Sequence, residues 1–186
     1  MRSLIRTQIE HIQPTSFAER AQWLDALAWV DGGAPLFRTA KPATPPKHLV
    51  SYFPVVDGDY ILLVDHKNAK RWLPTGGHVE PEEDPRITVV RELKEELGLT
   101  VPLTDVGPPL LVTVTETVGL TSGHVDVSLW YPIQALRAQP LNFDQSEFND
   151  ACWFHHDDAM QLATDPNLPM FLAKLRAGVA HTNTLR

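Results

Sequence analysis

Three glutamates lie within five residues of one another in a segment with helical periodicity: Glu92, Glu95 and Glu96. At about 100° per residue their side chains share one arc of the helix, roughly opposite an apolar stripe. The stripe is formed by Ile87, Val90, Leu93 and Leu97. Like charges at this spacing repel by only about 0.2–0.5 kcal/mol, so the cluster fits either a solvated acidic face or a functional site.

The residues that precede this segment favour the functional interpretation. Gly76 and Gly77 permit a tight loop with close backbone approach, so that backbone carbonyls could join the carboxylates around a cation. Hard divalent ions such as Mg²⁺ and Mn²⁺ prefer oxygen ligands, and oxygen-rich magnesium sites commonly act on phosphates. Asp84-Pro85 is a typical helix start and Gly98 a typical helix stop, which predicts a helix that presents the three glutamates together.

The composition limits the partners of such a site. The 186 residues carry a formal net charge of -7, which argues against an extended nucleic-acid polymer or an anionic membrane as partner. A small polyanion is not excluded, because metal ions can invert the local field of an acidic site. The single cysteine, Cys152, allows no internal disulfide and fits a reducing cytoplasm. Neither a membrane span nor a signal core is apparent, so we expect a cytoplasmic protein.

The elements that must position the glutamates divide the chain in two. Residues 1–31 are expected to be helical, and residues 35–47, with four prolines, form an extended connection. We therefore predict an N-terminal helical extension with its proline-rich connection at 1–47, followed by the main domain at 48–186.

The main domain alternates strand and helix patterns. The strand patterns fall at 48–56, 60–65, 110–118, 124–133 and 151–156. Pro54 indicates an edge or irregular pairing within the first of them. Helices are expected near 157–163 and 168–177. This order predicts an α/β layered domain with a mixed β-sheet.

The stretch around the glutamates resembles the Nudix box, G-x5-E-x7-R-E-U-x-E-E-x-G-U, where U is apolar. Every fixed position matches, through Gly77, Glu83, Arg91, Glu92, Leu93, Glu95, Glu96, Gly98 and Leu99. The strand patterns on both sides extend the resemblance over residues 48–178, and the GGHVE turn with the helical N-terminus looks like a bacterial subgroup. The resemblance implies the Nudix fold, an α/β/α sandwich with a mixed β-sheet and the Nudix loop-helix-loop.

The same resemblance implies a hydrolase that cleaves the diphosphate linkage of a nucleoside diphosphate joined to another group. Water attacks phosphorus with the help of Mg²⁺ or Mn²⁺. The implied metal ligands are the carboxylates of Glu92, Glu95 and Glu96 and the backbone carbonyl of Gly76. Supporting roles are implied for Gly77, Glu83 and Arg91. In one departure from the family pattern, Thr75 separates Pro74 from the paired glycines, so the turn before Gly76 could differ from that of the family.

Other residues carry weaker signals. His78 follows the glycines and could reach a phosphate, or could cap the loop. His124 and Asp126 lie two apart and so share one strand face, where they could contact substrate or solvent. Glu147 precedes the last strand, where the family often supplies another glutamate, and it competes with Glu92 for the role of general base.

Alternatives stay open at this stage. The expected partner is a small-molecule nucleotide, but nucleoside triphosphates, ADP-ribose, nucleotide sugars and dinucleoside polyphosphates all suit the same box. The N-terminal extension could cover the base or form a homodimer contact. A non-catalytic nucleotide-sensing module would tend to lose box glutamates, and an isopentenyl diphosphate isomerase would need a cysteine before the box; neither pattern is present.

Overall fold

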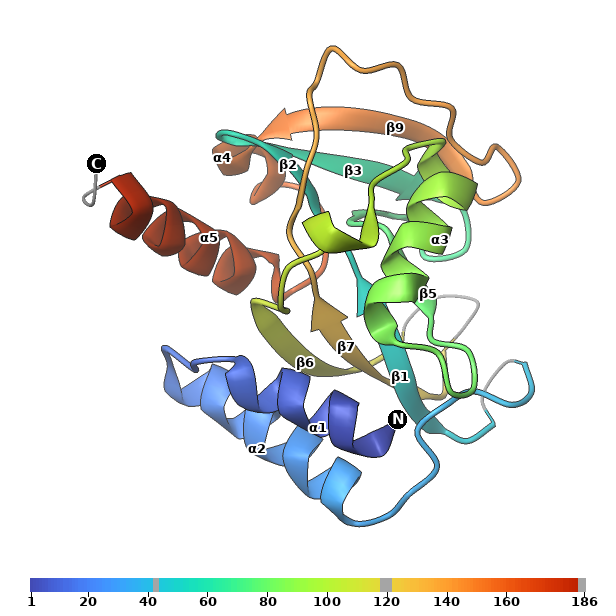
Figure 1. The fold of residues 1–186 in the computed structure, drawn as a ribbon. Helices are drawn as coiled ribbons and strands as arrows, with labels where there is room; N and C mark the ends of the chain where they lie inside the picture. The colour runs from blue at the N-terminus through green and yellow to red at the C-terminus, as the bar shows by residue number, and fades with distance from the viewer. Residues whose placement is uncertain (42–43, 118–121, 184–186) are drawn as a thin grey trace.

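The computed structural model describes residues 1–41, 44–117 and 122–183. The N-terminal segment forms two helices, α1 (Arg2–His11) and α2 (Phe17–Asp31), which lie side by side (Figure 1). The expectation of helix throughout 1–31 is therefore wrong at 12–16. Pro14 cannot continue a helix interior, and Ser16 starts α2 by accepting a hydrogen bond from the Glu19 backbone N–H at 3.1 Å.

Strands form two mixed sheets (Figure 1). The first has the order β5-β1-β7-β6, with the bounds Gly76–His78, Lys47–Tyr52, Val125–Trp130 and Leu111–Glu116. The second has the order β4-β3-β2-β8, with the bounds Arg71–Leu73, Tyr60–His66, Val55–Asp57 and Ile133–Gln134, and β9 (Phe148–His155) also pairs with β3. The pairs β1–β7 and β2–β8 are parallel and the others antiparallel, which confirms the predicted mixed pairing.

The predicted strand at 48–56 is divided between the two sheets. β1 ends at Tyr52 and β2 begins at Val55, because Pro54 lacks the N–H that an uninterrupted ladder would need. The short strands β4 and β5 were not predicted, and the predicted strand at 124–133 is divided, with β7 ending at Trp130 and Ile133 beginning β8. Strand β9 begins three residues before the predicted start at 151. The last residue of the predicted strand 110–118 lies outside the described residues.

Helix α3 (Pro85–Leu97) carries the three glutamates and has the predicted start and stop. The Asp84 carboxylate accepts the Arg86 backbone N–H at 3.0 Å, and Gly98 ends the helix in the left-handed region with φ 68°. The last two helices differ in length from expectation, since α4 covers only His156–Ala159 and α5 extends over Leu168–Asn183. A short 3-10 helix, η1 (Leu103–Asp105), follows α3.

The N-terminal helices share the main hydrophobic core. Ile5, Ile9 and Val30 are fully buried in the same cluster as Leu49 of β1 and Leu93 of α3. Helix α5 packs through Leu168, Phe171 and Leu172 into a second cluster that includes Trp130. The boundary at residue 47 therefore stays a proposal, since the extension packs with the domain rather than apart from it. No helix among the described residues is long and apolar enough to span a membrane.

Candidate active site

The three glutamates of α3 occupy different environments. Glu96 is 7% exposed, whereas the side chains of Glu92 and Glu95 are 15% and 60% exposed. Ile87 is 45% exposed, so the predicted apolar stripe is wrong at its first residue, and Glu96 does not lie opposite the buried face. Because α3 packs against β1 and β5, its buried face is rotated toward Thr88, Leu93, Glu96 and Leu97. A carboxylate therefore stands inside the domain.

The two glycines of β5 lie where neighbouring side chains approach the backbone too closely to leave room for a Cβ atom. A Cβ on Gly77 would lie 2.3 Å from Oε1 of Glu92, and a Cβ on Gly76 would lie 2.2 Å from the ring of Tyr52. Side chains at these positions would collide with the acid cluster on one side and with the packing of β1 on the other. The glycines therefore let β5 pass directly beside the carboxylate of Glu92.

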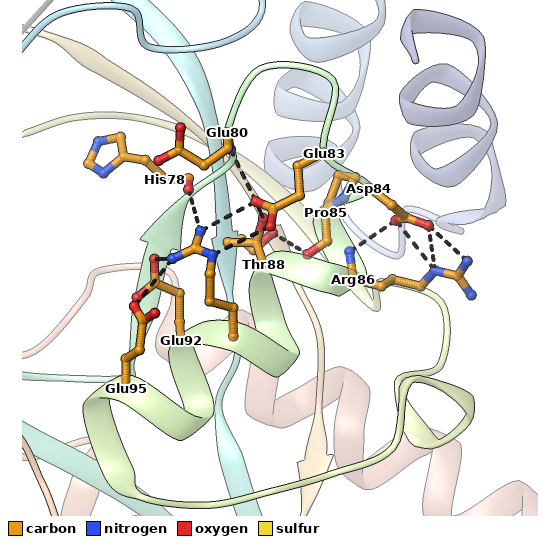
Figure 2. A network of polar contacts seen from close by, with 11 residues as sticks. His78, Glu80, Glu83, Asp84, Pro85, Arg86, Thr88, Glu92 and Glu95 are labelled. Atoms are coloured by element: carbon orange, nitrogen blue, oxygen red, sulfur yellow. Dashed lines mark hydrogen bonds and ion pairs between the residues drawn. The ribbon is translucent and has the colours of Figure 1, made fainter.

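Arg91 links the loop to the helix. Its guanidinium lies 3.3 Å from Glu83 Oε2, 2.7 Å from Glu92 Oε1 and 3.4 Å from Glu95 Oε2. Figure 2 shows the Glu83, Glu92 and Glu95 carboxylates converging on one guanidinium group. Burial lowers the pKa of Arg91, but the hydrogen bond to Glu83 and the charge of Glu92 outweigh it and raise that pKa overall. Arg91 thus partly neutralises the cluster, in addition to the supporting role that the resemblance implied for it with Glu83.

The buried carboxylates hold their negative charge at a cost. Burial, followed by the charge of Glu92 and then of Glu147, raises the pKa of Glu96 well above its ordinary value, while the Gly76 backbone N–H lowers it. Burial also raises the pKa of Glu92, against the lowering effect of Arg91. Among the described residues, Glu96 Oε2 is buried without a hydrogen-bond partner. A divalent cation fits this set, because it would give that oxygen a partner and offset the mutual repulsion.

A cavity of about 560 Å³ opens beside the cluster. It brings together most of the predicted site residues: Gly76, His78, Glu96, His124, Asp126 and Glu147 all line it. Gly77, Glu92, Glu83 and Glu95 are not part of this lining: Gly77 lies against Glu92, and Glu83 and Glu95 contact Arg91. The ligand roles of Glu92, Glu95 and Glu96 and the carbonyl role of Gly76 stay predictions.

Glu147 reaches the cluster from a different part of the chain. Its side chain is exposed, and its charge contributes to the raised pKa of both Glu92 and Glu96. The backbone carbonyl of Glu147 accepts the Lys67 N–H at 3.0 Å, which ties its loop to the end of β3. The loop therefore holds an exposed acid beside the cluster.

Several cavity residues were not predicted from the sequence. Arg38, Lys41 and Arg71 supply positive charge to the wall of an otherwise acidic site. His48 lies beside the cavity, with its Nε2 3.1 Å from Nε2 of His78. Burial lowers the pKa of His78 to about 3, and the charge of Arg38 adds to this effect. The scattered positions of these residues in the chain left no local motif to find.

Comparison with models of protein families identifies the family of this chain. The family model for the NUDIX domain matches residues 46–175, so the chain belongs to the NUDIX family. The predicted Nudix fold, with mixed sheets and helices on both sides, is confirmed. No curated protein matches the chain.

Solved structures share the fold at low sequence identity. The Escherichia coli dihydroneopterin triphosphate pyrophosphohydrolase is 15% identical, with a TM-score of 0.58, over 67% of this chain and 91% of the other. The Caenorhabditis elegans Ap4A hydrolase, in a binary complex, is 19% identical with a TM-score of 0.56, over 72% and 98%. The NUDIX domain of Shewanella oneidensis NrtR, with ADP ribose, is 18% identical with a TM-score of 0.56, over 70% and 87%. These likenesses concern the fold alone.

Proposed function

We propose that the protein is a divalent-metal-dependent hydrolase that cleaves the diphosphate linkage of a nucleoside diphosphate joined to another group. The observation that carries this proposal is the buried Glu96 carboxylate, whose unpartnered oxygen lies at a cavity that Glu147 also lines. Without a cation at this point, Glu96 would either stay protonated, as its raised pKa favours, or keep a destabilising buried charge.

The glutamates of α3 are the proposed ligands. Glu92 and Glu96 would hold Mg²⁺ or Mn²⁺ from the inner face of the helix, with Glu95 at its exposed flank and the Gly76 carbonyl as a further oxygen ligand. When bound, a divalent ion supplies positive charge that offsets the charge developing on phosphate oxygens and favours deprotonation of the attacking water. Arg91 and Glu83 fix the helix against the loop, so that the ligands are positioned before substrate binds.

Substrate binding falls to the cavity wall. Arg38, Lys41 and Arg71 provide charges that attract a polyphosphate into a site that otherwise repels it. His124 and Asp126 lie on the same wall. The volume of about 560 Å³ lies within the range of small-molecule sites, which supports a nucleotide rather than a polymer as substrate.

Glu147 is the better candidate for the general base. One carboxylate oxygen of Glu92 is engaged by Arg91 at 2.7 Å, so this residue is less able to accept a proton from water. Glu147 lines the cavity and is exposed, so its carboxylate is accessible to a water molecule in the site. We assign it to proton abstraction and Glu92 to metal binding.

The test is a substrate panel with product identification. Nucleoside triphosphates, ADP-ribose, nucleotide sugars and dinucleoside polyphosphates would be incubated with Mg²⁺ or Mn²⁺ in ¹⁸O-labelled water. The proposal predicts cleavage between two phosphorus atoms and one labelled oxygen on a phosphate product, abolished by a chelator. Tight nucleotide binding without any turnover across the panel would instead establish a sensing module.

A further inference from the structure

Three histidines and an aspartate meet at one end of the first sheet. His48 is the second residue of β1 and His78 the last residue of β5, while His124 immediately precedes β7 and Asp126 is its second residue. In the parallel β1–β7 pair His48 stands directly opposite Asp126, and in the antiparallel β1–β5 pair His78 stands opposite Val50. Three neighbouring strands thus deliver four potential metal ligands to one face, none of them from the glutamates of α3.

The distances between the ligand atoms match a small coordination sphere. Nε2 of His48 lies 3.1 Å from Nε2 of His78, and Oδ1 of Asp126 lies 3.4 Å from Nε2 of both His48 and His124. One ligand atom from each of the four residues fits within 4.8 Å of the others. A tetrahedral zinc site with bonds of about 2.0–2.1 Å places its ligands about 3.3–3.4 Å apart. The three distances of 3.1, 3.4 and 3.4 Å match this spacing, and every other pair of ligand atoms lies within 4.8 Å.

Hydrogen bonds at the outer nitrogens orient the rings. His48 Nδ1 lies 2.8 Å from the Pro45 carbonyl, so it carries the proton and leaves a lone pair on Nε2. His124 Nδ1 contacts Thr117 Oγ1 at 3.2 Å. Carbonyl and hydroxyl partners of this kind commonly hold metal-binding imidazoles in the required tautomer. The inward nitrogens are thereby directed at one another.

Two members of the cluster are buried, two are half-buried, and its charges suit a cation. His48 and His124 are 0% and 5% exposed, and among the described residues Asp126 Oδ1 is buried without a hydrogen-bond partner. The positive charge of Arg38 lowers the pKa of His78 and would repel a metal ion bound at the cluster. The negative charge of the Asp126 carboxylate offsets this repulsion. Imidazoles are neutral when they bind metal, and burial keeps His78 in that form.

We propose that His48, His78, His124 and Asp126 bind a transition-metal ion, with Zn²⁺ as the preferred ion, in a closed tetrahedral site. Three imidazole nitrogens favour Zn²⁺ over Mg²⁺, which prefers oxygen. Four protein ligands leave no open position, so the ion is structural. It joins β5 to β1 and β7 and thereby stabilises the Gly76-Gly77 segment that borders the glutamates.

The test measures metal binding without reference to hydrolysis. Purified protein would be stripped with a chelator, exposed to Zn²⁺ or Co²⁺, dialysed, and assayed for metal content and for the visible bands of tetrahedral Co²⁺. We expect about one ion retained per chain, with intense tetrahedral bands that Zn²⁺ displaces. Asp126→Asn and His124→Gln should weaken Co²⁺ affinity by more than the roughly 10–100-fold that loss of an outer partner costs.

Matched variants make the result specific. His66→Gln changes a cavity histidine outside the cluster and should keep the Co²⁺ bands, as should Glu96→Gln, which alters the other metal site. Wild-type protein that retains no Zn²⁺ after dialysis, or Co²⁺ bands that persist in Asp126→Asn but vanish in Glu96→Gln, would overturn the assignment. Circular dichroism checks folding, and the metal content of the wild type decides the matter if a variant unfolds. The metal could bind at this site in a protein without hydrolase activity, and hydrolysis could occur in a protein that binds no metal here. A negative result for one proposal therefore does not decide the other.

Discussion

Replacement of Gly77 by alanine tests whether the close passage of β5 beside Glu92 sets the active-site geometry. The backbone of Gly77 does not lie in the left-handed region, so alanine is conformationally permitted. Its Cβ would lie 2.3 Å from Glu92 Oε1, against about 3.4 Å for an ordinary contact. The carboxylate must therefore move by about 1 Å, a displacement that can reduce turnover by about 100-fold.

The assay is kcat on the best substrate of the panel at saturating Mg²⁺, with circular dichroism and thermal unfolding as checks on the fold. Gly107→Ala is the matched control, because a Cβ there meets nothing within 4 Å. In a Glu92→Gln background the added loss from Gly77→Ala should be much smaller than in the wild type, since both changes disturb one group. Wild-type kcat in Gly77→Ala, or full additivity with Glu92→Gln, would refute the reasoning.

Three further outcomes are expected. Because the folded-state pKa of Glu96 is raised, the metal-free protein should lose stability as pH rises from about 4.3 through that raised value. In urea unfolding between pH 4 and 8, Glu96→Gln should show a shallower loss of stability than the wild type, and identical pH profiles would contradict the raised pKa. Glu147→Gln should lower kcat by about 10²–10⁴-fold with little change in apparent Mg²⁺ affinity; a weaker metal affinity that excess Mn²⁺ restores would make Glu147 a ligand instead. Arg91→Lys should lower the free energy of unfolding by about 1–3 kcal/mol, because one ammonium group cannot replace the guanidinium contacts to Glu83, Glu92 and Glu95. An unchanged melting temperature would count against a stabilising role for these contacts.

Local signals in the sequence predicted the central element well. Asp84-Pro85 and Gly98 define α3 because capping and helix termination depend on the residues at the ends themselves. The orientation of α3 was less predictable. Its buried face depends on the strands that it packs against, and contact with β1 and β5 buries Glu96 while leaving Ile87 exposed.

Long-range pairing explains what the sequence did not predict. His48 joins His124 and Asp126 only because β1 and β7 are parallel neighbours in one register, although the two strands lie far apart in the chain. Arg38 reaches the cavity from the connection before β1, which shows no local pattern beyond its prolines. Pro54 indicated an irregularity within the predicted strand at 48–56, but it did not predict that the two halves of this strand belong to different sheets.

The most direct test of the account is the Mg²⁺ dependence of diphosphate cleavage by the wild type and by Glu96→Gln. The variant is nearly isosteric and replaces a buried charged oxygen by an amide, so the fold should persist. We expect no turnover without a divalent ion in either protein, and a rate for Glu96→Gln reduced by about 10³-fold, equivalent to about 4 kcal/mol. A Glu96→Gln rate near that of the wild type at every Mg²⁺ concentration, or full wild-type activity after exhaustive chelation, would contradict the account.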